Sequence, residues 1–406
     1  MNAAQHLFRN PFRPGAGHMP PFLAGRNPEI LEFRRLLGQE TVLENMVLTG
    51  LRGVGKTVLL ETLKPIALDS KWLWVGTDLS ETTSISEKNL ATRLLTDLSV
   101  VTSSFVVSKT DRREIGFKGE STEIPQTLNF HMLTHLYDQT PGLAVDKLKR
   151  VLELVWQYLR QAKRPGLVFA YDEAQNLSDH SAKDQYPLSL LLDVFQSLQR
   201  KDVKFLLILT GLPTLFPKLV DARTFSERMF RIVFLDRLDS SSSREAILKP
   251  MELSAPKRIF TKATVDTLVR SSGGYPYFIQ FMCREAYDAL IQKVGAARQS
   301  VIPVREIVRK LDTDFFAGRW ARATDRQREL LSVVARLENS DAEFTVQEVV
   351  EKSKEILEKP FSSSHVNQMF VTLAEAGLIY KNRRGKYAFA VPLLNEFILR
   401  QLKQDE

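Results

Sequence analysis

The sequence has few cysteines and histidines and no long apolar run, and each absence excludes a class of protein. Its single cysteine, Cys283, excludes an internal disulfide and any metal site built from several cysteines. The six histidines show no metal-ligand spacing such as HExxH. No apolar run approaches the roughly 20 residues of a membrane-spanning helix, and none follows Arg9 and Arg13 as a signal peptide requires. We therefore expect a cytoplasmic protein that does not contact a membrane.

What is present is typical of a globular protein with more than one domain. Apolar residues make up 44% of the chain and charged residues 26%, and 406 residues are too many for one compact core. The formal net charge of +8 at pH 7 permits an acidic partner, with nucleic acid as the first candidate. The excess of positive charge lies before residue 306, because residues 306–406 contain 16 basic and 16 acidic residues.

Apolar runs alternate with helical patterns through the first 238 residues. Residues 10–25, rich in proline and glycine, predict an extended arm, and residues 28–37 predict a helix. Strands that alternate with helices form a parallel sheet with helices on both faces, which predicts an α/β fold. The expected strands are residues 45–48, 72–75, 167–171, 205–209 and 232–235.

Residues 101–142 interrupt this alternation and are expected to be an insertion. Residues 105–107 and 115–117 flank a polar turn at residues 108–114, which predicts a β-hairpin. The basic side chains of the turn are those of Lys109, Arg112 and Arg113.

The second half of the chain is predominantly helical. Residues 240–243 are four serines and predict a loop, and the helical pattern that follows is interrupted at residues 273–276. Three further helices and two strands describe a winged-helix domain; they are expected at residues 325–337, 345–354, 363–375, 377–381 and 386–390. We therefore expect three domains: an α/β core at 1–238, an α-helical domain at 239–310 and a winged helix at 311–406.

Residues 50–57, GLRGVGKT, match GxxxxGK[ST] at every fixed position and lie between an apolar strand and a helix. Glycines let the backbone wrap closely around phosphates and point its N–H groups at them, at the positive end of the following helix. Lys56 is expected to reach the β- and γ-phosphates of ATP, and the Thr57 hydroxyl to bind Mg²⁺. The residues expected to contact ATP here are Gly50, Arg52, Gly53, Val54, Gly55, Lys56, Thr57 and Val58. The alternative is a chance glycine-rich turn.

Two carboxylates end the apolar run at residues 167–171. Asp172 is expected to hold Mg²⁺, directly or through water, and Glu173 to orient and deprotonate the attacking water. The alternative is a solvated acidic turn after a strand. Without Glu173 the pattern would predict ATP binding alone; with it, hydrolysis is expected.

Three further polar residues are candidates for contact with the γ-phosphate. Thr210 follows the run at residues 205–209 and can hydrogen-bond the γ-phosphate or the attacking water, or it caps the strand or the next helix. Arg228 or Arg231, just before the last strand, can reach the γ-phosphate of a neighbouring subunit, and we favour Arg228. The alternative for both is an ordinary surface arginine.

These residues together resemble the AAA+ superfamily. They are most similar to the branch that contains archaeal replication initiators, transposition-regulator ATPases and the signal-transducing STAND ATPases. Residues 172–177, DEAQNL, look like the Walker B motif of transposition regulators, and residues 274–276, GYP, resemble the glycine-x-proline signature of the helical lid. The resemblance implies that Gly25 and Arg26 flank adenine, that Pro276 lies at the nucleotide, and that the chain forms a homo-oligomer with ATP at the subunit interfaces.

The sequence departs from this family in the lid. The AAA+ lid commonly carries a sensor arginine near the glycine-rich turn, but residues 275–278 are YPYF and the next arginine is Arg284. This departure puts in doubt whether the lid senses the γ-phosphate directly.

Two functions agree with these residues. One is a DNA-dependent ATPase that assembles on duplex DNA through its ATP sites, as an initiator, loader or transposition regulator. The other is a STAND-like switch, in which ATP opens a closed monomer and the winged helix engages a protein partner. A degenerate nucleotide binder conflicts with the intact Lys56, Thr57, Asp172 and Glu173.

If the winged helix binds DNA, one set of its residues would contact bases and another would contact phosphates. Base contacts in the major groove would come from Ser363, Ser364, His365, Asn367 and Gln368, and phosphate contacts from Lys381, Arg383, Arg384 and Lys386. The basic hairpin and wing favour the DNA-dependent ATPase. The balanced charge of residues 306–406 and the glycine-x-proline signature favour the switch.

Overall fold

The computed structural model describes residues 10–15, 17–113, 121–253, 260–292 and 302–405 and divides into two compact units. One unit contains Met1–Arg26, Gly50–Val58 and Leu235–Glu406. The other contains Asn27–Thr49 and Leu59–Phe234. The P-loop therefore belongs to the same unit as the helices of the second half of the chain.

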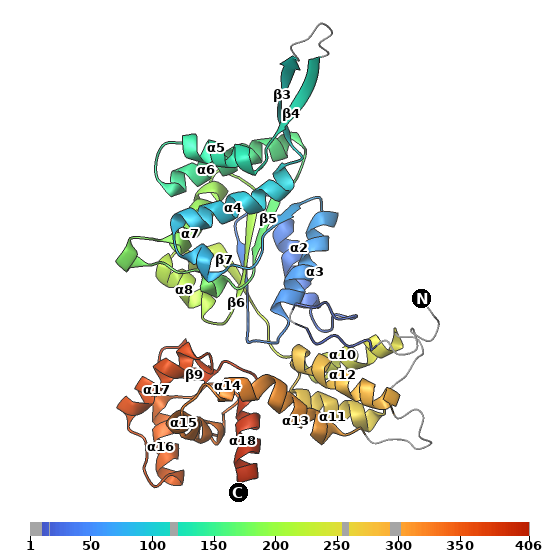
Figure 1. Ribbon diagram of the computed structural model, residues 1–406, viewed down its shortest axis with the longest axis vertical. Coiled ribbons are helices and arrows are strands. Elements are labelled where there is room, and N and C mark those ends of the chain that lie inside the picture. The colour runs from blue at the N-terminus through green and yellow to red at the C-terminus, as the bar shows by residue number, and fades with distance from the viewer. Residues whose placement is uncertain (1–9, 16, 114–120, 254–259, 293–301, 406) are drawn as a thin grey trace. The chain divides into compact units, whose positions relative to one another are not determined.

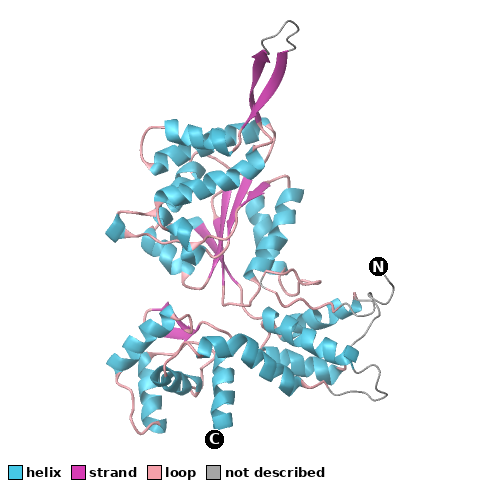
Figure 2. Ribbon diagram, in the orientation of Figure 1, coloured by secondary structure: helices cyan, strands magenta, loops and turns pink. Residues whose placement is uncertain are grey.

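A five-stranded parallel sheet forms the centre of the unit that contains residues 59–234 (Figures 1 and 2). Its strands, in the order β2-β5-β6-β1-β7, are β2 (Leu73–Val75), β5 (Leu167–Tyr171), β6 (Phe205–Gly211), β1 (Asn45–Thr49) and β7 (Phe230–Phe234). β1, β5 and β6 are buried along their whole length, as expected for the continuous apolar runs of an inner parallel strand. The predicted α/β fold is confirmed.

Helices pack on both faces of this sheet. Because successive side chains of a strand point to opposite faces, Leu73 and Val75 join the core beneath α4, whereas the Trp74 ring lies 6.2 Å from Phe33 of α2. The helices in this part of the chain are α2 (Asn27–Leu37), α3 (Lys56–Asp69), α4 (Glu87–Thr102), α5 (Phe130–Gln139), α6 (Ala144–Gln161), α7 (Pro187–Gln199), α8 (Leu215–Ala222) and α9 (Ser226–Met229).

The insertion contains the predicted hairpin, but with longer strands. β3 (Val106–Arg113) and β4 (Ser121–Thr127) pair antiparallel and extend away from α5 and α6 (Figure 1). The turn expected at residues 108–114 is strand as far as Arg113, because the ladder continues through the polar residues. The second strand expected at residues 115–117 lies outside the described residues.

The other unit is mainly helical. It contains α10 (Ser240–Glu252), α11 (Lys262–Ser272), α12 (Pro276–Gln292), α13 (Val304–Leu311), a π-helical turn, η5 (Asp312–Ala317), and α14 (Gly318–Trp320). The prediction of a loop at residues 240–243 is wrong. These serines form the first turn of α10, because the Asp239 side chain accepts from the Ser242 N–H at 2.7 Å and caps the helix.

The end of the chain contains three helices, a small antiparallel sheet and a last helix that the sequence pattern did not predict. These are α15 (Asp325–Ala335), α16 (Val346–Ile356), α17 (Ser363–Glu375), β8 (Ile379–Arg383), β9 (Lys386–Phe389) and α18 (Leu394–Asp405). Thr324 and Thr345 begin α15 and α16 with capping boxes. The order is compatible with the predicted winged helix. Among the described helices, no one combines the length and apolar character needed to cross a bilayer.

Candidate nucleotide site

The predicted P-loop, residues 50–57, is a tight turn between the end of β1 and the first turn of α3. Gly53 and Gly55 have φ angles of 80° and 90°, a left-handed backbone that favours glycine. The Lys56 Nζ donates to two carbonyl oxygens at the start of the loop, both at 2.9 Å, so its ammonium lies against the loop backbone. A glycine-rich turn at a helix N-terminus with a cation beside it fits a bound phosphate.

Arg26, expected at adenine, braces the P-loop in the structure. Its side chain is buried, and Nη2 donates to the carbonyl oxygens of Val54 at 2.9 Å and Asp236 at 2.8 Å. These hydrogen bonds hold the loop against the chain that follows β7. Contact with adenine stays a prediction for Gly25 and Arg26.

The lid signature meets the P-loop directly. Pro276 begins α12, and the next residue, Tyr277, donates its backbone N–H to the carbonyl oxygen of Gly53 at 3.1 Å. Gly274 has φ 78°, and a Cβ there would lie 2.3 Å from the carbonyl oxygen of Leu238. The lid turn is thus packed against backbone on two sides, which places the start of α12 beside the phosphate-binding loop.

The N-terminal arm runs from the lid to the P-loop. Phe12 is buried, with its ring 6.3 Å from each of Phe260 and Tyr287. Farther along, a Cβ on Gly17 would lie 3.3 Å from the Thr57 Cγ2. The arm therefore borders the residue that is expected to bind Mg²⁺, which the sequence did not indicate.

In the unit that contains the sheet, the carboxyl ends of β5, β6 and β1 form one edge. Asp172 follows β5 and is 4% exposed, and Thr49 ends β1 opposite Gly211. Thr210 lies inside β6 and not after it as expected, because the strand continues to Gly211. Among the described residues, the buried hydroxyls of Thr49 and Thr210 have no hydrogen-bond partner. Buried polar groups are normally paired, so this edge fits a polar ligand or water.

The donors at this edge also suit a magnesium ion that is shared with a phosphate. Mg²⁺ takes oxygen ligands and is usually held by one or two carboxylates together with water and phosphate oxygens. Asp172 supplies such a carboxylate. Within the described residues, no group of three or more His, Cys, Asp or Glu side chains could hold a metal alone.

Glu173, the expected base, is held by a neighbour that the sequence analysis did not single out. Its backbone is left-handed, with φ 52°, and its Oε2 accepts a short hydrogen bond from the Gln175 Nε2. The Gln175 Oε1 accepts from the Leu212 N–H at 3.1 Å, and its carbonyl oxygen accepts from the Lys218 Nζ at 2.6 Å. Burial lowers the pKa of Lys218. Gln175 thus links Glu173 to the chain that follows β6.

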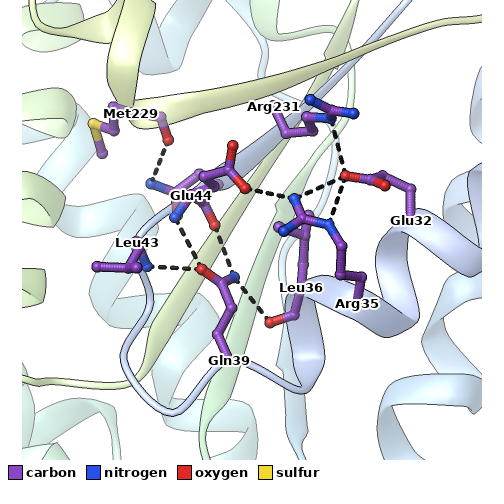
Figure 3. Close-up of polar contacts among 9 residues, drawn as sticks. Glu32, Arg35, Leu36, Gln39, Leu43, Glu44, Met229 and Arg231 are labelled. Atoms are coloured by element: carbon purple, nitrogen blue, oxygen red, sulfur yellow. Dashed lines mark hydrogen bonds and ion pairs between the residues drawn. The ribbon is translucent and has the colours of Figure 1, made fainter.

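The two candidate arginines differ in their surroundings, and Arg231 lies inside β7 rather than before the last strand as expected. Figure 3 shows Arg231 of β7 and Arg35 of α2 turned toward Glu32, whose Oε1 lies 3.0 Å from the Arg231 Nε. Hydrogen bonds from Arg35, and then the charges of Arg35 and Arg231, lower the pKa of Glu32. Arg228 is exposed and forms no ion pair within the part of the chain that the structure describes. The environment of Arg228 suits contact with another chain better than that of Arg231.

Part of the positive charge of the predicted wing is neutralised by a carboxylate of the same unit, that of Glu343. The Arg383 Nε and Nη2 donate to the Glu343 Oε2 at 2.9 and 2.6 Å, and the Asn382 Nδ2 donates to Oε1 at 2.6 Å. These contacts lower the pKa of Glu343. Lys381 and Arg384 remain exposed.

The predicted base-reading side chains share one exposed face of α17. Val366 and Met369 of the same helix are buried, which orients the helix. The exposed residues of the set are Ser363, Ser364, His365, Asn367 and Gln368.

Comparisons with known proteins agree with this description. Residues 23–220, which include the P-loop, Asp172, Glu173 and Thr210, match the model of an AAA ATPase domain. Residues 313–398 match a model described as a domain of unknown function (DUF8462). No similar sequence was found among curated proteins.

Two solved structures have a similar fold over almost the whole chain. The Walker-type ATPase PABY2304 of Pyrococcus abyssi has 15% identity and a TM-score of 0.55, covering 93% of this chain and 96% of that one. The ORC2 protein of Aeropyrum pernix has 13% identity and a TM-score of 0.54, covering 97% and 98%. At these identities the likeness concerns the fold alone.

Proposed function

Residues 23–220 are an AAA ATPase domain and the chain is an ATPase, and from this premise we propose that it binds and hydrolyses ATP with Mg²⁺ while associated with DNA. The observation that carries the proposal is the P-loop itself. Gly53 and Gly55 have the left-handed backbone that a phosphate-binding turn requires, the Lys56 ammonium lies against the loop, and the start of α12 is hydrogen-bonded to Gly53. The ORC2 protein with a similar fold was solved in ADPNP and ADP complexes, which supports an adenine nucleotide as the ligand.

We assign the roles by chemistry. Lys56 binds the β- and γ-phosphates, and Glu173 takes the proton of the attacking water. Thr210, buried at the end of β6, hydrogen-bonds that water or the γ-phosphate. Thr57 and Asp172 would hold Mg²⁺, and the ion would supply positive charge against the phosphates.

Association with DNA is supported by the end of the chain. The exposed face of α17 and the exposed Lys381 and Arg384 have the polar and basic character of a base-reading helix and a phosphate-contacting wing. The overall charge of +8 favours the same kind of partner. The proposal includes the domain division at residues 238 and 310, assembly of identical subunits through Arg228, and a cytoplasmic location.

A second candidate, the ATP-driven switch with a protein partner, is favoured by one specific contact. Arg383, one of the wing residues expected to contact a phosphate, is paired with Glu343. In this alternative the winged helix binds a protein, and nucleotide controls whether it is accessible.

Steady-state ATP hydrolysis with and without duplex DNA, at low and moderate salt, distinguishes the two. Stimulation by DNA that fades as salt rises supports the DNA-associated ATPase, because phosphate contacts weaken steeply with salt. Indifference to DNA supports the switch. Lys56→Ala is the control, since it should abolish ATP binding in both cases. ATP binding unchanged by Lys56→Ala would show that the P-loop assignment is wrong.

A further inference from the structure

The positive charge of Arg319 is affected by those of two other arginines in the same unit, Arg52 and Arg322. Arg52 belongs to the P-loop and is exposed, Arg319 lies on α14 and is half-buried, and Arg322 follows two residues after that helix. Burial lowers the pKa of the Arg319 guanidinium first, and the positive charges of Arg52 and then Arg322 lower it further. In the described part of the chain, none of the three pairs with a carboxylate.

A continuous set of contacts fixes Arg319 relative to the loop. The Tyr277 N–H donates to the carbonyl oxygen of Gly53 at 3.1 Å, and its ring lies 5.3 Å from that of Phe315. The Arg319 guanidinium lies 4.2 Å from the centre of the Phe315 ring, and Nη1 donates to the Phe315 carbonyl oxygen at 2.6 Å. Arg319 is therefore linked to Gly53, the residue that follows Arg52, through Phe315 and Tyr277.

The element that carries Arg319 is anchored to the end of the chain. Phe316 stacks on Phe397 of α18 at 5.1 Å, and Arg400 of the same helix donates to both carboxylate oxygens of Asp312, at 2.9 and 2.6 Å. Asp312 and Phe316 belong to the π-helical turn η5, and π-helical turns occur frequently at functional sites. A ligand bound to Arg319 would therefore contact an element that is packed against α18.

Cations that lack counter-charges and stand within Coulombic range repel one another, and a bound anion removes that cost. Arg52 belongs to the loop that is expected to bind phosphates, so the first candidate for this anion is the nucleotide. We propose that Arg52 and Arg319 bind the terminal phosphate of ATP, and that this contact, made from outside the lid, distinguishes ATP from ADP. The inference depends on the proposed ATP binding and adds the residues that read the nucleotide state.

The test compares ATP and ADP dissociation constants for the full chain and its variants. Arg319→Met keeps the aliphatic packing on Phe315 and removes the charge, and Arg52→Ala changes an exposed side chain. Each should weaken ATP binding about 10- to 100-fold, the range of a hydrogen bond to a charged group, and leave ADP binding unchanged. Arg319→Lys, which keeps the charge, should recover part of the loss.

Arg336→Ala is the matched control, because Arg336 is an exposed arginine that forms no ion pair among the described residues. An unchanged ratio of ATP to ADP affinity in both Arg52→Ala and Arg319→Met overturns the inference, and would indicate that these cations bind another anion, such as a DNA phosphate. Failure of the proposed function has a different signature, since Lys56→Ala would then leave the binding of both nucleotides intact.

Discussion

At the scale of single residues, the proposed base is the part of the site whose removal has the sharpest consequence. Glu173→Gln keeps the size of the side chain but cannot accept a proton. We expect hydrolysis to fall by about a hundredfold or more, the usual contribution of a general base, while ATP binding persists. Measuring both in the same preparation checks the assignment. A variant that hydrolyses ATP at the normal rate would show that Glu173 is not the base.

Gln175 offers a second prediction at this scale, because it holds the Glu173 carboxylate and is itself fixed by Leu212 and Lys218. Gln175→Ala releases that carboxylate. We expect a lower kcat with an unchanged KM for ATP, since the nucleotide-binding residues are untouched. Gln161→Ala, an exposed glutamine at the end of α6, should change neither. A loss confined to KM would contradict a positioning role.

At the scale of elements, the turn between α11 and α12 depends on a glycine for two reasons. Gly274 has a left-handed backbone, and a Cβ there would meet the Leu238 carbonyl oxygen at 2.3 Å. Gly377 has a similar φ of 70°, but a Cβ there would meet no atom within 4 Å. Gly377→Ala should therefore cost only backbone strain, about 1 kcal/mol, and Gly274→Ala distinctly more. Thermal unfolding of both variants measures the difference, and equal losses would exclude the predicted clash.

The wing offers a test of DNA binding in which a substitution should increase the affinity for DNA. Glu343 neutralises Arg383, so Glu343→Gln should free one cation for a phosphate. We expect tighter binding to duplex DNA and a steeper dependence of affinity on salt. Glu338→Gln makes the same change of charge at an exposed residue and separates the local effect from net charge. If both variants bind DNA equally, the wing does not contact phosphates.

Local patterns predicted most elements correctly, and long-range contacts account for the errors. The apolar runs of β1, β5 and β6 and the glycines of the P-loop carry their structure in their own sequence. The serines at residues 240–243 do not, because the cap supplied by Asp239 decides between loop and helix. The hydrogen bond from Gln175 to Glu173 and the contacts that link Arg319 to the P-loop form only in the folded chain. No spacing rule in one sequence reveals them.

At the scale of the whole molecule, the differing environments of Arg228 and Arg231 predict how subunits cooperate. Arg231 is occupied by Glu32, whereas Arg228 is exposed, so Arg228 is the one able to act on a neighbour's ATP. Hydrolysis per chain should therefore rise with protein concentration, and Arg228→Ala should reduce it by about a thousandfold, as loss of such an arginine does elsewhere. Arg231→Ala is the matched control and should retain most of the activity.

Mixing two inactive variants gives the decisive form of this experiment. An Arg228→Ala chain keeps its own Lys56 and Glu173, and a Glu173→Gln chain keeps Arg228. If Arg228 acts across the subunit boundary, some sites in the mixture combine an intact P-loop chain with an intact arginine, and activity returns. If Arg228 acts within its own chain, no such combination exists and the mixture stays inactive. Recovery that depends on the ratio of the two variants would therefore establish both the role of Arg228 and assembly through the ATP site.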